Sequence, residues 1–145
     1  MKCSEIMTKS PSCCLTTDTV YQAAQLMKSE DVGSIPIVSS HETKKLEGIV
    51  TDRDLVLKVV AEARNPKSTP VKDAMTTDIY TCRANDNVEK ALELMEHHQV
   101  RRIPIVDERD QLVGIIAQAD VATRVEEPRK TAEVVEGISK AATFG

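Results

Sequence analysis

The chain has 145 residues, of which 41% are hydrophobic and 2% aromatic, and its formal net charge is -4. This length suits one compact domain or two half-sized units that share a core. With 19 basic against 23 acidic residues, a general nucleic-acid binder is not expected. No apolar run approaches the roughly 20 residues that cross a bilayer, and the first residues do not resemble a signal peptide. We therefore expect a cytoplasmic protein without a membrane partner.

An internal repeat is the most informative feature of the sequence. The motif IPIV at Ile35–Val38 returns 68 residues later at Ile103–Val106. The stretch GIVTDRD, Gly48–Asp54, returns 66 residues later in the degraded form GIIAQAD, Gly114–Asp120. The shift of two residues falls in the polar segment 39–45, where a loop tolerates an insertion. The chain is therefore a tandem duplication.

The first copy predicts five elements. A short strand is expected over residues 12–17, followed by a helix with an apolar stripe at Val20, Ala23, Ala24 and Met27. Two strands follow, over 34–40 and 46–51, and a proline near the start of the first suits a strand entrance or an edge. A helix over 54–63 closes the copy.

The second copy predicts the same order of elements. A strand over 79–84 precedes a helix with its stripe at Val88, Ala91, Leu92 and Met95, and Asp86 with Glu89 resembles a capping box at its start. Strands over 102–108 and 112–117 and a short helix over 120–125 complete the copy.

These elements predict an α+β fold made of two β-α-β-β-α repeats. The predicted boundaries are repeat 1 over 1–64, a linker with two prolines over 65–70, repeat 2 over 71–126, and a tail over 127–145 that forms a short helix. Each repeat alone buries little surface. We expect the two to pack sheet against sheet about a pseudo-twofold axis, which leaves clefts where ligands bind.

The corner between the last strand and the last helix of the first copy carries the candidate chemistry. Thr51 places a hydroxyl at the strand end, and Asp54 follows within the first helical turn. A carboxylate there accepts two hydrogen bonds from a cis-diol such as a ribose, and a helix N-terminus favours an anionic group. The alternative is an N-cap pair without a ligand, since Thr-x-x-Asp is common at helix starts. The duplication of the whole arrangement favours the functional interpretation.

The order of Met-Thr, helix, IPIV strand and G-h-x-[T/S]-x-x-[D/N] corner (h is an apolar residue), found twice, resembles a pair of cystathionine β-synthase (CBS) domains, or Bateman module. The resemblance extends from about Cys3 to about Val125. It implies binding of adenosine-containing ligands such as AMP, ADP, ATP or S-adenosylmethionine. It also implies that the motif aspartate holds the ribose hydroxyls while the threonine or serine assists with ribose or phosphate.

Transferred to this sequence, the resemblance implies one complete site and one degraded site. Thr51 and Asp54 match the motif fully, whereas Asp120 matches in the second copy and Ala117 stands at the hydroxyl position. Losing a hydrogen bond to a charged ligand costs about 1.5–3 kcal/mol, which is a tenfold or larger drop in affinity.

The resemblance also implies that each motif faces the IPIV strand of the other copy. The residues expected opposite Thr51 and Asp54 are Arg101, Arg102, Ile103 and Pro104. Guanidinium groups suit phosphate by charge and geometry, which favours a phosphorylated nucleotide. The alternative is that the two arginines are solvated or contact Asp107 or Glu108.

The cysteines suggest neither a metal site nor a disulfide framework. Cys3, Cys13, Cys14 and Cys82 form no C-x-x-C pair and show no ligand spacing with the histidines. We expect four reduced, mostly buried thiols and no metal ligands.

The expected function is that of a non-catalytic regulatory module. It binds an AMP-, ADP- or ATP-like nucleotide in the cleft between repeats, and passes the signal on as a change in conformation or assembly. We expect a homodimer, output through an effector protein or through assembly, and no required cofactor. The alternatives are a structural dimerisation module with empty clefts, or a sensor of S-adenosylmethionine or an NAD-type ligand. An enzyme is not expected, because the sequence has no nucleophile–base pair, Walker loop or zinc spacing.

Overall fold

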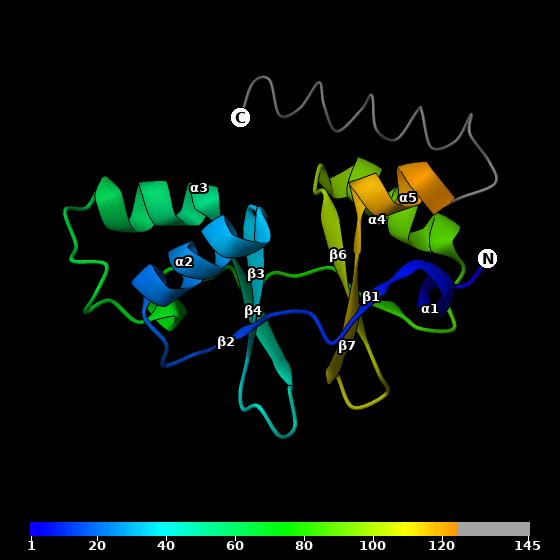
Figure 1. Cartoon of the computed structure of the whole chain (residues 1–145), viewed down its shortest axis with the longest axis horizontal. Coiled ribbons are helices and arrows are strands. Elements are labelled where there is room, and N and C mark those ends of the chain that lie inside the picture. The colour runs from blue at the N-terminus through cyan, green and yellow to red at the C-terminus, as the bar shows by residue number, and fades with distance from the viewer. Residues whose placement is uncertain (125–145) are drawn as a thin grey trace. The chain divides into compact units, whose positions relative to one another are not determined.

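The computed structural model of the chain describes residues 1–124, which fold into two compact units (Figure 1). Residues Ser12–Ile79 form what we call the N-repeat unit. The C-repeat unit contains Met1–Pro11 together with the described residues 80–124. Over the described residues, every helix is too short or too polar to cross a bilayer. The helix predicted for the tail 127–145 lies outside the described residues.

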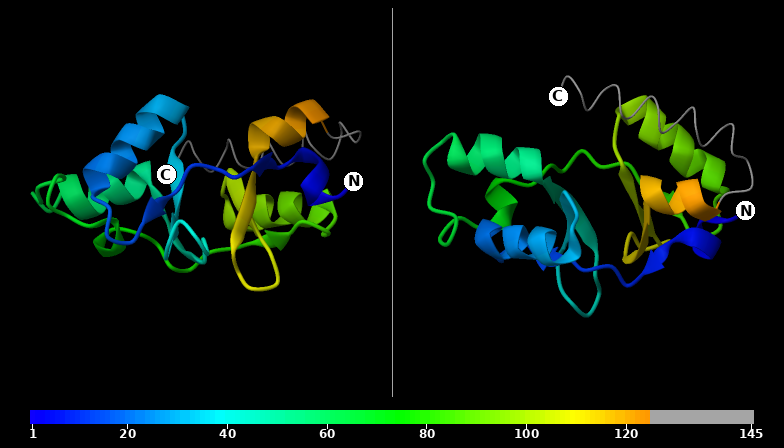
Figure 2. Two further views of the ribbon diagram at one scale, coloured as in Figure 1. Left: turned by 60° about the horizontal axis from the view of Figure 1, so that its bottom comes forward. Right: turned by 45° about the horizontal axis from the view of Figure 1, so that its top comes forward.

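The N-repeat unit has a three-stranded sheet with helices packed against it. Its elements are β2 (Cys14–Leu15), α2 (Val20–Glu30), β3 (Ser34–Val38), β4 (Leu46–Thr51), α3 (Asp52–Leu55), the π-helical turn η1 (Val56–Val60) and the 3-10 turn η2 (Val71–Asp73). In the order β2-β3-β4, β2 runs parallel to β3 and β4 antiparallel to it. Helices α2 and α3 lie side by side (Figures 1 and 2).

The C-repeat unit repeats this plan with two additional N-terminal elements. Its elements are α1 (Cys3–Ile6), β1 (Thr8–Lys9), β5 (Cys82–Arg83), α4 (Val88–His98), β6 (Arg102–Val106), β7 (Leu112–Ala117) and α5 (Gln118–Arg124). The strand order is β1-β7-β6-β5, in which α4 packs on β6 and α5 on β7. Each copy therefore has the order β-α-β-β-α, and the predicted fold class is confirmed.

The two units exchange the first segments of the sequence repeats. Thr8, at the start of the first repeat, pairs with β7 of the C-repeat unit, and Thr76, at the start of the second, pairs with Ile49 of β4 in the N-repeat unit. The segment 65–70, which the sequence suggests as a linker, lies inside the N-repeat unit. There the carbonyl of Thr69 accepts from the backbone N–H of Val20 at 2.9 Å. The chain instead passes between units at residues 11–12 and 79–80.

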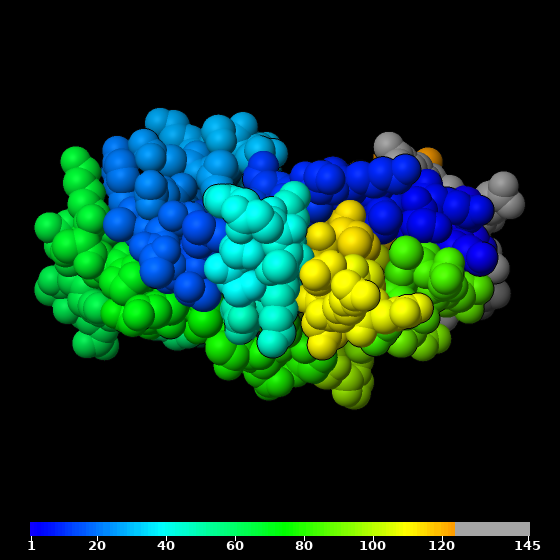
Figure 3. Space-filling model, turned by 90° about the horizontal axis from the view of Figure 1, so that it is seen from below, coloured from blue at the N-terminus to red at the C-terminus, as the bar shows by residue number. Residues whose placement is uncertain are grey.

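The hairpin turns explain the two-residue shift in the repeat. The turn between β3 and β4 spans 39–45, whereas the turn between β6 and β7 spans only 107–111. Both turns lie at the surface of their own unit, as the cyan and yellow segments of Figure 3 show. The insertion is therefore located where the sequence predicts it.

Both long helices begin at a capping residue, and the cap of α4 differs by one residue from the predicted one. Thr19 caps α2 and forms a reciprocal capping box with Gln22. Asn87 caps α4 by accepting from the N–H of Glu89 at 3.0 Å. The predicted box of Asp86 with Glu89 is wrong, because the Asp86 carboxylate accepts instead from the N–H of Arg83 at 2.7 Å.

Proline is tolerated in the central strands because their outer neighbours are short. Strand β2 pairs with β3 only at Ile37 and Val38, so no strand on that side needs a hydrogen bond from Pro36. The same holds for Pro104, because β5 pairs with β6 only at Ile105 and Val106.

The core of each unit is mainly aliphatic, as the scarcity of aromatic residues requires. In the N-repeat unit, Val20 and Ala23 of α2 pack with Ile35 and Ile37 of β3 and with Val59 of η1. The core of the C-repeat unit is built in the same way from α4, β6, β7 and the N-terminal residues Cys3 and Ile6. These two clusters fix the strand-to-helix corners in place.

The helix predicted over 54–63 begins two residues earlier and widens into a π-helical turn. The N–H of Ala61 donates to the carbonyl of Val56 at 2.8 Å, a five-residue step. Such turns occur frequently at functional sites. Three apolar side chains of this segment are exposed: Val56 by 54%, Leu57 by 47% and Val60 by 71%.

Candidate functional site

The complete motif forms the corner between β4 and α3. Thr51 ends β4, where it pairs with Ser34 of β3, and Asp52 begins α3 with its N–H donating to the Gly33 carbonyl at 2.9 Å. Thr51 has extended backbone angles, as an N-cap residue requires. The sheet thus places the threonine hydroxyl and the first helical turn at one edge of the N-repeat unit.

Thr51 and Asp54 cap the helix reciprocally. The Asp54 N–H donates to Thr51 Oγ1 at 3.1 Å, and the Thr51 N–H donates to Asp54 Oδ2 at 3.0 Å. The capping alternative is therefore realised in this structure. The box also fixes the orientation of the carboxylate, which is a requirement for binding a ligand with a defined geometry.

The Asp54 carboxylate has two further donors around it. Thr76 Oγ1 lies 3.2 Å from Oδ2 and 3.3 Å from Oδ1. Lys58 Nζ lies 3.1 Å from Oδ1 and also donates to the carbonyl of Ala74 at 3.0 Å. The side chain of Asp54 is 13% exposed and that of Lys58 is 44% exposed. The carboxylate is therefore largely covered, and the more exposed side chain of Lys58 is one of the groups next to it.

This arrangement can accept hydrogen bonds from a polyol. A carboxylate offers about four lone-pair directions, and only the backbone bond from Thr51 is fixed by the fold. The hydroxyl of Thr76 and the ammonium of Lys58 sit on rotatable side chains, so two ligand hydroxyls can replace them. A backbone N–H, a hydroxyl and an ammonium donate to this carboxylate, an arrangement that suits the binding of a ligand.

The glycine of the motif serves the exchanged segment. A Cβ on Gly48 would lie 2.8 Å from the carbonyl oxygen of Thr76 and 3.0 Å from the sulfur of Met75. A Cβ on Gly114 would lie 2.5 Å from the sulfur of Met7 and 3.1 Å from the carbonyl oxygen of Thr8. In both copies, a Met-Thr segment therefore crosses directly over the glycine. The hydroxyl of Thr76 reaches Asp54 because of this close approach.

The degraded motif occupies the equivalent corner of the C-repeat unit. Ala117 ends β7, where it pairs with Arg102, and the N–H of Gln118 donates to the carbonyl of Arg101 at 2.8 Å. Asp120 is half-buried in the first turn of α5. The side-chain oxygen Oε1 of Gln118 is buried and has no hydrogen-bond partner within residues 1–124. Without the threonine hydroxyl, this corner lacks the reciprocal cap of the complete motif.

The IPIV residues predicted to face Thr51 and Asp54 belong to the other unit. Arg101 is exposed just before β6 and Arg102 is half-buried on it, whereas Ile103 and Pro104 are buried. Within their own unit, the arginines lie next to Ala117 and Gln118. Their predicted position across from Thr51 remains a prediction.

Lys58 and Thr76 are the two site residues that sequence reasoning missed. One signal was available for the lysine: a cation stands four residues after the motif aspartate in both copies, as Lys58 and as Arg124. Residues at this spacing share a helix face. The signal for Thr76 is the Met-Thr pair that begins each repeat, as Met7-Thr8 and as Met75-Thr76.

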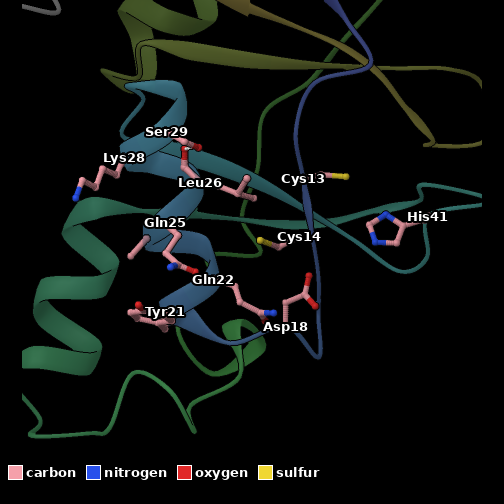
Figure 4. Close-up of a pocket in the computed structure, with 11 residues that line it drawn as sticks. Cys13, Cys14, Asp18, Tyr21, Gln22, Gln25, Leu26, Lys28, Ser29 and His41 are labelled. Atoms are coloured by element: carbon pink, nitrogen blue, oxygen red, sulfur yellow. Dashed lines mark hydrogen bonds between the residues drawn. The ribbon is translucent and has the colours of Figure 1, made fainter.

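A shallow hollow of about 980 Å³ lies elsewhere on the N-repeat unit. Figure 4 shows that its labelled side chains come from β2 and the residues on either side of it, from α2, and from the turn that carries His41. The Asp18 carboxylate on its wall accepts from the N–H of Leu15 at 2.8 Å. Cys13 and Cys14 line this hollow, so the vicinal pair is separate from the Thr51–Asp54 corner within the unit.

The cysteines are free, and three of the four are fully buried. Burial raises the pKa of the Cys14 thiol to about 12. A hydrogen bond from the Cys82 thiol lowers the pKa of Cys3, and the same bond raises the pKa of Cys82. Burial also raises the pKa of Cys13, although this thiol is only partly covered.

We expect iodoacetamide to modify Cys13 alone in the folded protein. The thiolate is the reactive form, and the pKa of Cys13 lies above the ordinary thiol value. The alkylation rate will therefore continue to increase at pH values where an ordinary thiol is already fully ionised. Mass spectrometry of the native protein will show one adduct, and unfolding in urea will expose four sites. Rapid native labelling of Cys14 would contradict the burial of β2.

The histidines at the end of α4 have a structural partner. The ring of His98 stacks on Tyr80 with centroids 3.4 Å apart and planes 7° from parallel, and His97 contacts His98 edge to face. Across the described residues, His, Cys, Asp and Glu side chains form no cluster that could hold a metal ion.

The doubled β-α-β-β-α plan, with a strand-to-helix corner in each copy, defines a tandem-repeat α+β fold, and comparison with known proteins identifies the family. The family model for the CBS domain matches residues 3–61 and 71–127. The chain therefore belongs to the CBS domain family and contains two copies of that domain.

The similar proteins are themselves CBS proteins. The chain is 41% identical over 119 residues to the CBS domain-containing protein YhcV of Bacillus subtilis, covering 82% of this chain and 78% of YhcV. It is 36% identical over 123 residues to hypoxic response protein 1 of Mycobacterium tuberculosis, covering 85% of this chain and 84% of that protein. These relatives thus consist largely of the same pair of domains.

Two solved structures illustrate the range of bound species in similar folds. The crystal structure of hypoxic response protein I with two coordinated zinc ions has a TM-score of 0.78 and 34% identity, over 86% of this chain and 99% of that chain. The CBS domain pair of protein MJ0100, in complex with 5′-methylthioadenosine and S-adenosyl-L-methionine, has a TM-score of 0.69 and 25% identity, over 85% of this chain and 94% of that chain.

Proposed function

We propose that the chain is a non-catalytic regulatory module that binds an adenosine-containing ligand at the Thr51–Asp54 corner. The observation that carries the proposal is the oriented Asp54 carboxylate, which accepts hydrogen bonds from the movable side chains of Lys58 and Thr76. The reciprocal cap holds this carboxylate in place, so it is preorganised for two hydroxyl donors.

Membership of the CBS family supports the ligand class. The related CBS pair of MJ0100 binds 5′-methylthioadenosine and S-adenosyl-L-methionine. Both molecules carry a ribose with free 2′ and 3′ hydroxyls, as AMP, ADP and ATP do. These ligands therefore share a cis-diol, whose two hydroxyls can donate hydrogen bonds to a carboxylate.

The charge of the ligand is a separate part of the proposal. Arg101 and Arg102 favour a phosphorylated nucleotide if they face the complete motif, since guanidinium groups bind phosphate in bidentate fashion. The MJ0100 ligands carry no phosphate, which makes S-adenosylmethionine the second candidate. We propose the AMP-like ligand first because the chain supplies three cations, the two arginines and Lys58, at these corners.

The signal passes through assembly or an effector protein, and we propose that the chain is a cytoplasmic homodimer. Val56, Leu57 and Val60 form an exposed apolar surface on η1. The equivalent positions of the second repeat are Ala122, Thr123 and Glu126, so this apolar surface belongs to one repeat only. A contact between copies would remove it from water.

Val60→Glu is expected to shift a dimer to monomer, because it places a charge in an apolar contact. Size-exclusion chromatography with light scattering will measure the mass. Ala122→Glu, on the equivalent exposed helix of the second repeat, is the matched control and should leave the dimer intact. Equal masses for wild type and Val60→Glu would contradict this interface.

The function is tested by the molecule that the protein retains and by the ligands that stabilise it. Mass spectrometry of the purified protein should identify a compound with an adenosine group. A thermal-shift panel of adenosine, AMP, ADP, ATP, NADH and S-adenosylmethionine should raise the melting temperature for at least one. Stabilisation at 100 times Kd is about 2.7 kcal/mol, which a melting curve resolves easily. No shift with any compound would reject ligand sensing and favour the structural dimerisation module.

A further inference from the structure

Lys58 contacts more than the aspartate one helical turn before it. Its ammonium bridges two acceptors, Asp54 Oδ1 at 3.1 Å and the carbonyl of Ala74 at 3.0 Å. The residue lies in the middle of the π-helical turn Val56–Val60, directly after the complete motif. In the C-repeat unit, by contrast, the helix at the degraded motif, α5, is an α-helix over Gln118–Arg124.

A second aspartate–lysine pair has the same four-residue spacing but lies outside the two strand-to-helix motifs. Asp86 and Lys90 are also four residues apart, with Lys90 Nζ 3.2 Å from Asp86 Oδ2, and Asp86 also accepts from a backbone N–H three residues before it. The Asp86 side chain is 26% exposed, whereas that of Asp54 is 13% exposed. The Asp86–Lys90 pair is therefore a structural twin of Asp54–Lys58 in a place where no ligand is proposed.

Ribose hydroxyls and the Lys58 ammonium compete for the same carboxylate oxygens. Both are hydrogen-bond donors, and Oδ1 accepts from Lys58 at 3.1 Å and from Thr76 at 3.3 Å. An ion pair that is partly exposed contributes little to stability, so its release opposes binding only weakly. A lysine side chain has four rotatable carbons, so the released ammonium can turn to an anionic group near the ribose.

Resting on the proposed function, we propose that Lys58 determines ligand specificity: it neutralises Asp54 in the ligand-free protein and moves to a 5′-phosphate when a ribose takes over the carboxylate. A phosphorylated nucleoside gives the displaced ammonium a new partner. An uncharged nucleoside only displaces it. Lys58 therefore selects nucleotides over nucleosides at this corner.

The test compares AMP with adenosine, which differ only in the phosphate, by calorimetric titration of the wild type and three variants. In Lys58→Met, we expect AMP to bind roughly tenfold more weakly, as loss of one charged contact implies. Adenosine should bind equally well or up to about threefold more tightly, because nothing has to be displaced. Lys90→Met, which removes the twin pair, should leave both affinities at wild-type values. Lys58→Arg keeps the charge and should retain most of the preference for AMP.

The outcomes separate this inference from the function on which it rests. If wild type and Lys58→Met bind both compounds with an unchanged ratio of affinities, Lys58 is not a selector, and ligand sensing stands. If wild type binds adenosine as tightly as AMP, the inference also fails. If wild type binds neither compound, the role of Lys58 is rejected, and the thermal-shift panel with S-adenosylmethionine decides separately whether the corner senses a ligand at all. Circular dichroism of each variant will establish that it is folded.

Discussion

Asp54→Asn is expected to abolish the stabilisation of the protein by its ligand. The amide keeps one oxygen for the Thr51 N–H, which lies 3.0 Å from the carboxylate in the wild type, but it cannot accept two hydroxyls as an anion does. Hydrogen bonds to a charged group contribute about 1.5–3 kcal/mol each. The loss of two predicts a decrease in affinity of at least about a hundredfold. Titration calorimetry and thermal shift with the ligand identified by mass spectrometry will measure it.

The matched control for this prediction is Asp86→Asn. Asp86 makes the same types of contact, a backbone N–H at 2.7 Å and a lysine four residues on at 3.2 Å. The N–H of Arg83 also holds the pKa of Asp86 below its usual range, so the group is ionised at neutral pH. Both variants will lose some stability, but only Asp54→Asn should lose ligand binding. Equal ligand affinities for the two would show that Asp54 is a cap and nothing more.

Gly48→Ala is expected to cause the largest loss of stability among single substitutions at the motif. The new Cβ would lie 2.8 Å from the Thr76 carbonyl oxygen, which is backbone and cannot rotate away. Overpacking of this kind costs about 1–3 kcal/mol. Urea denaturation will measure the free energy of unfolding. Because the clash moves Thr76 away from Asp54, ligand affinity should fall as well.

Gly33→Ala provides the control for the glycine prediction. Its new Cβ would lie 3.1 Å from Oδ2 of Asp52, the end of an exposed and flexible side chain that can move. We expect a change within about 0.5 kcal/mol, as for most surface substitutions. If Gly48→Ala is as harmless as Gly33→Ala, the Met75–Thr76 segment does not cross over β4 as described.

The sequence predicted the parts of the fold that depend on local pattern. The stripes at Val20 and Val88 mark helices that the structure contains, and the IPIV motifs mark strands with buried side chains. The two-residue shift of the repeat falls in the hairpin turn, as expected for an exposed loop. These predictions succeeded because periodicity and turn chemistry are local properties.

The exchange of the first segments could not be predicted in the same way. Thr8 and Thr76 each lie in a short extended segment, and such segments have no periodicity that reveals their partners. A glycine in each motif indicates a close approach, but the residue type alone does not say whether a ligand or a backbone approaches. The structure shows a backbone. The π-helical turn at Val56–Val60 likewise has no local signature in an otherwise regular helical pattern.

Within the candidate site, Thr51 and Asp54 were identified from the sequence, and their mutual hydrogen bonds were foreseen as an alternative. Lys58 was missed because its role depends on a contact with Ala74, sixteen residues away. Whether Arg101 and Arg102 complete this corner depends on the packing of the two units, which residue types alone do not determine.

The central claim is that Asp54 exchanges its internal donors for the hydroxyls of a ribose. A crystal structure with the adenosine compound that stabilises the protein most tests this directly. We predict both ribose hydroxyls within hydrogen-bond distance of the Asp54 carboxylate, with Lys58 turned away from it. An electron density in which Thr76 and Lys58 still hold the carboxylate, while the compound is absent or bound elsewhere, would contradict the account.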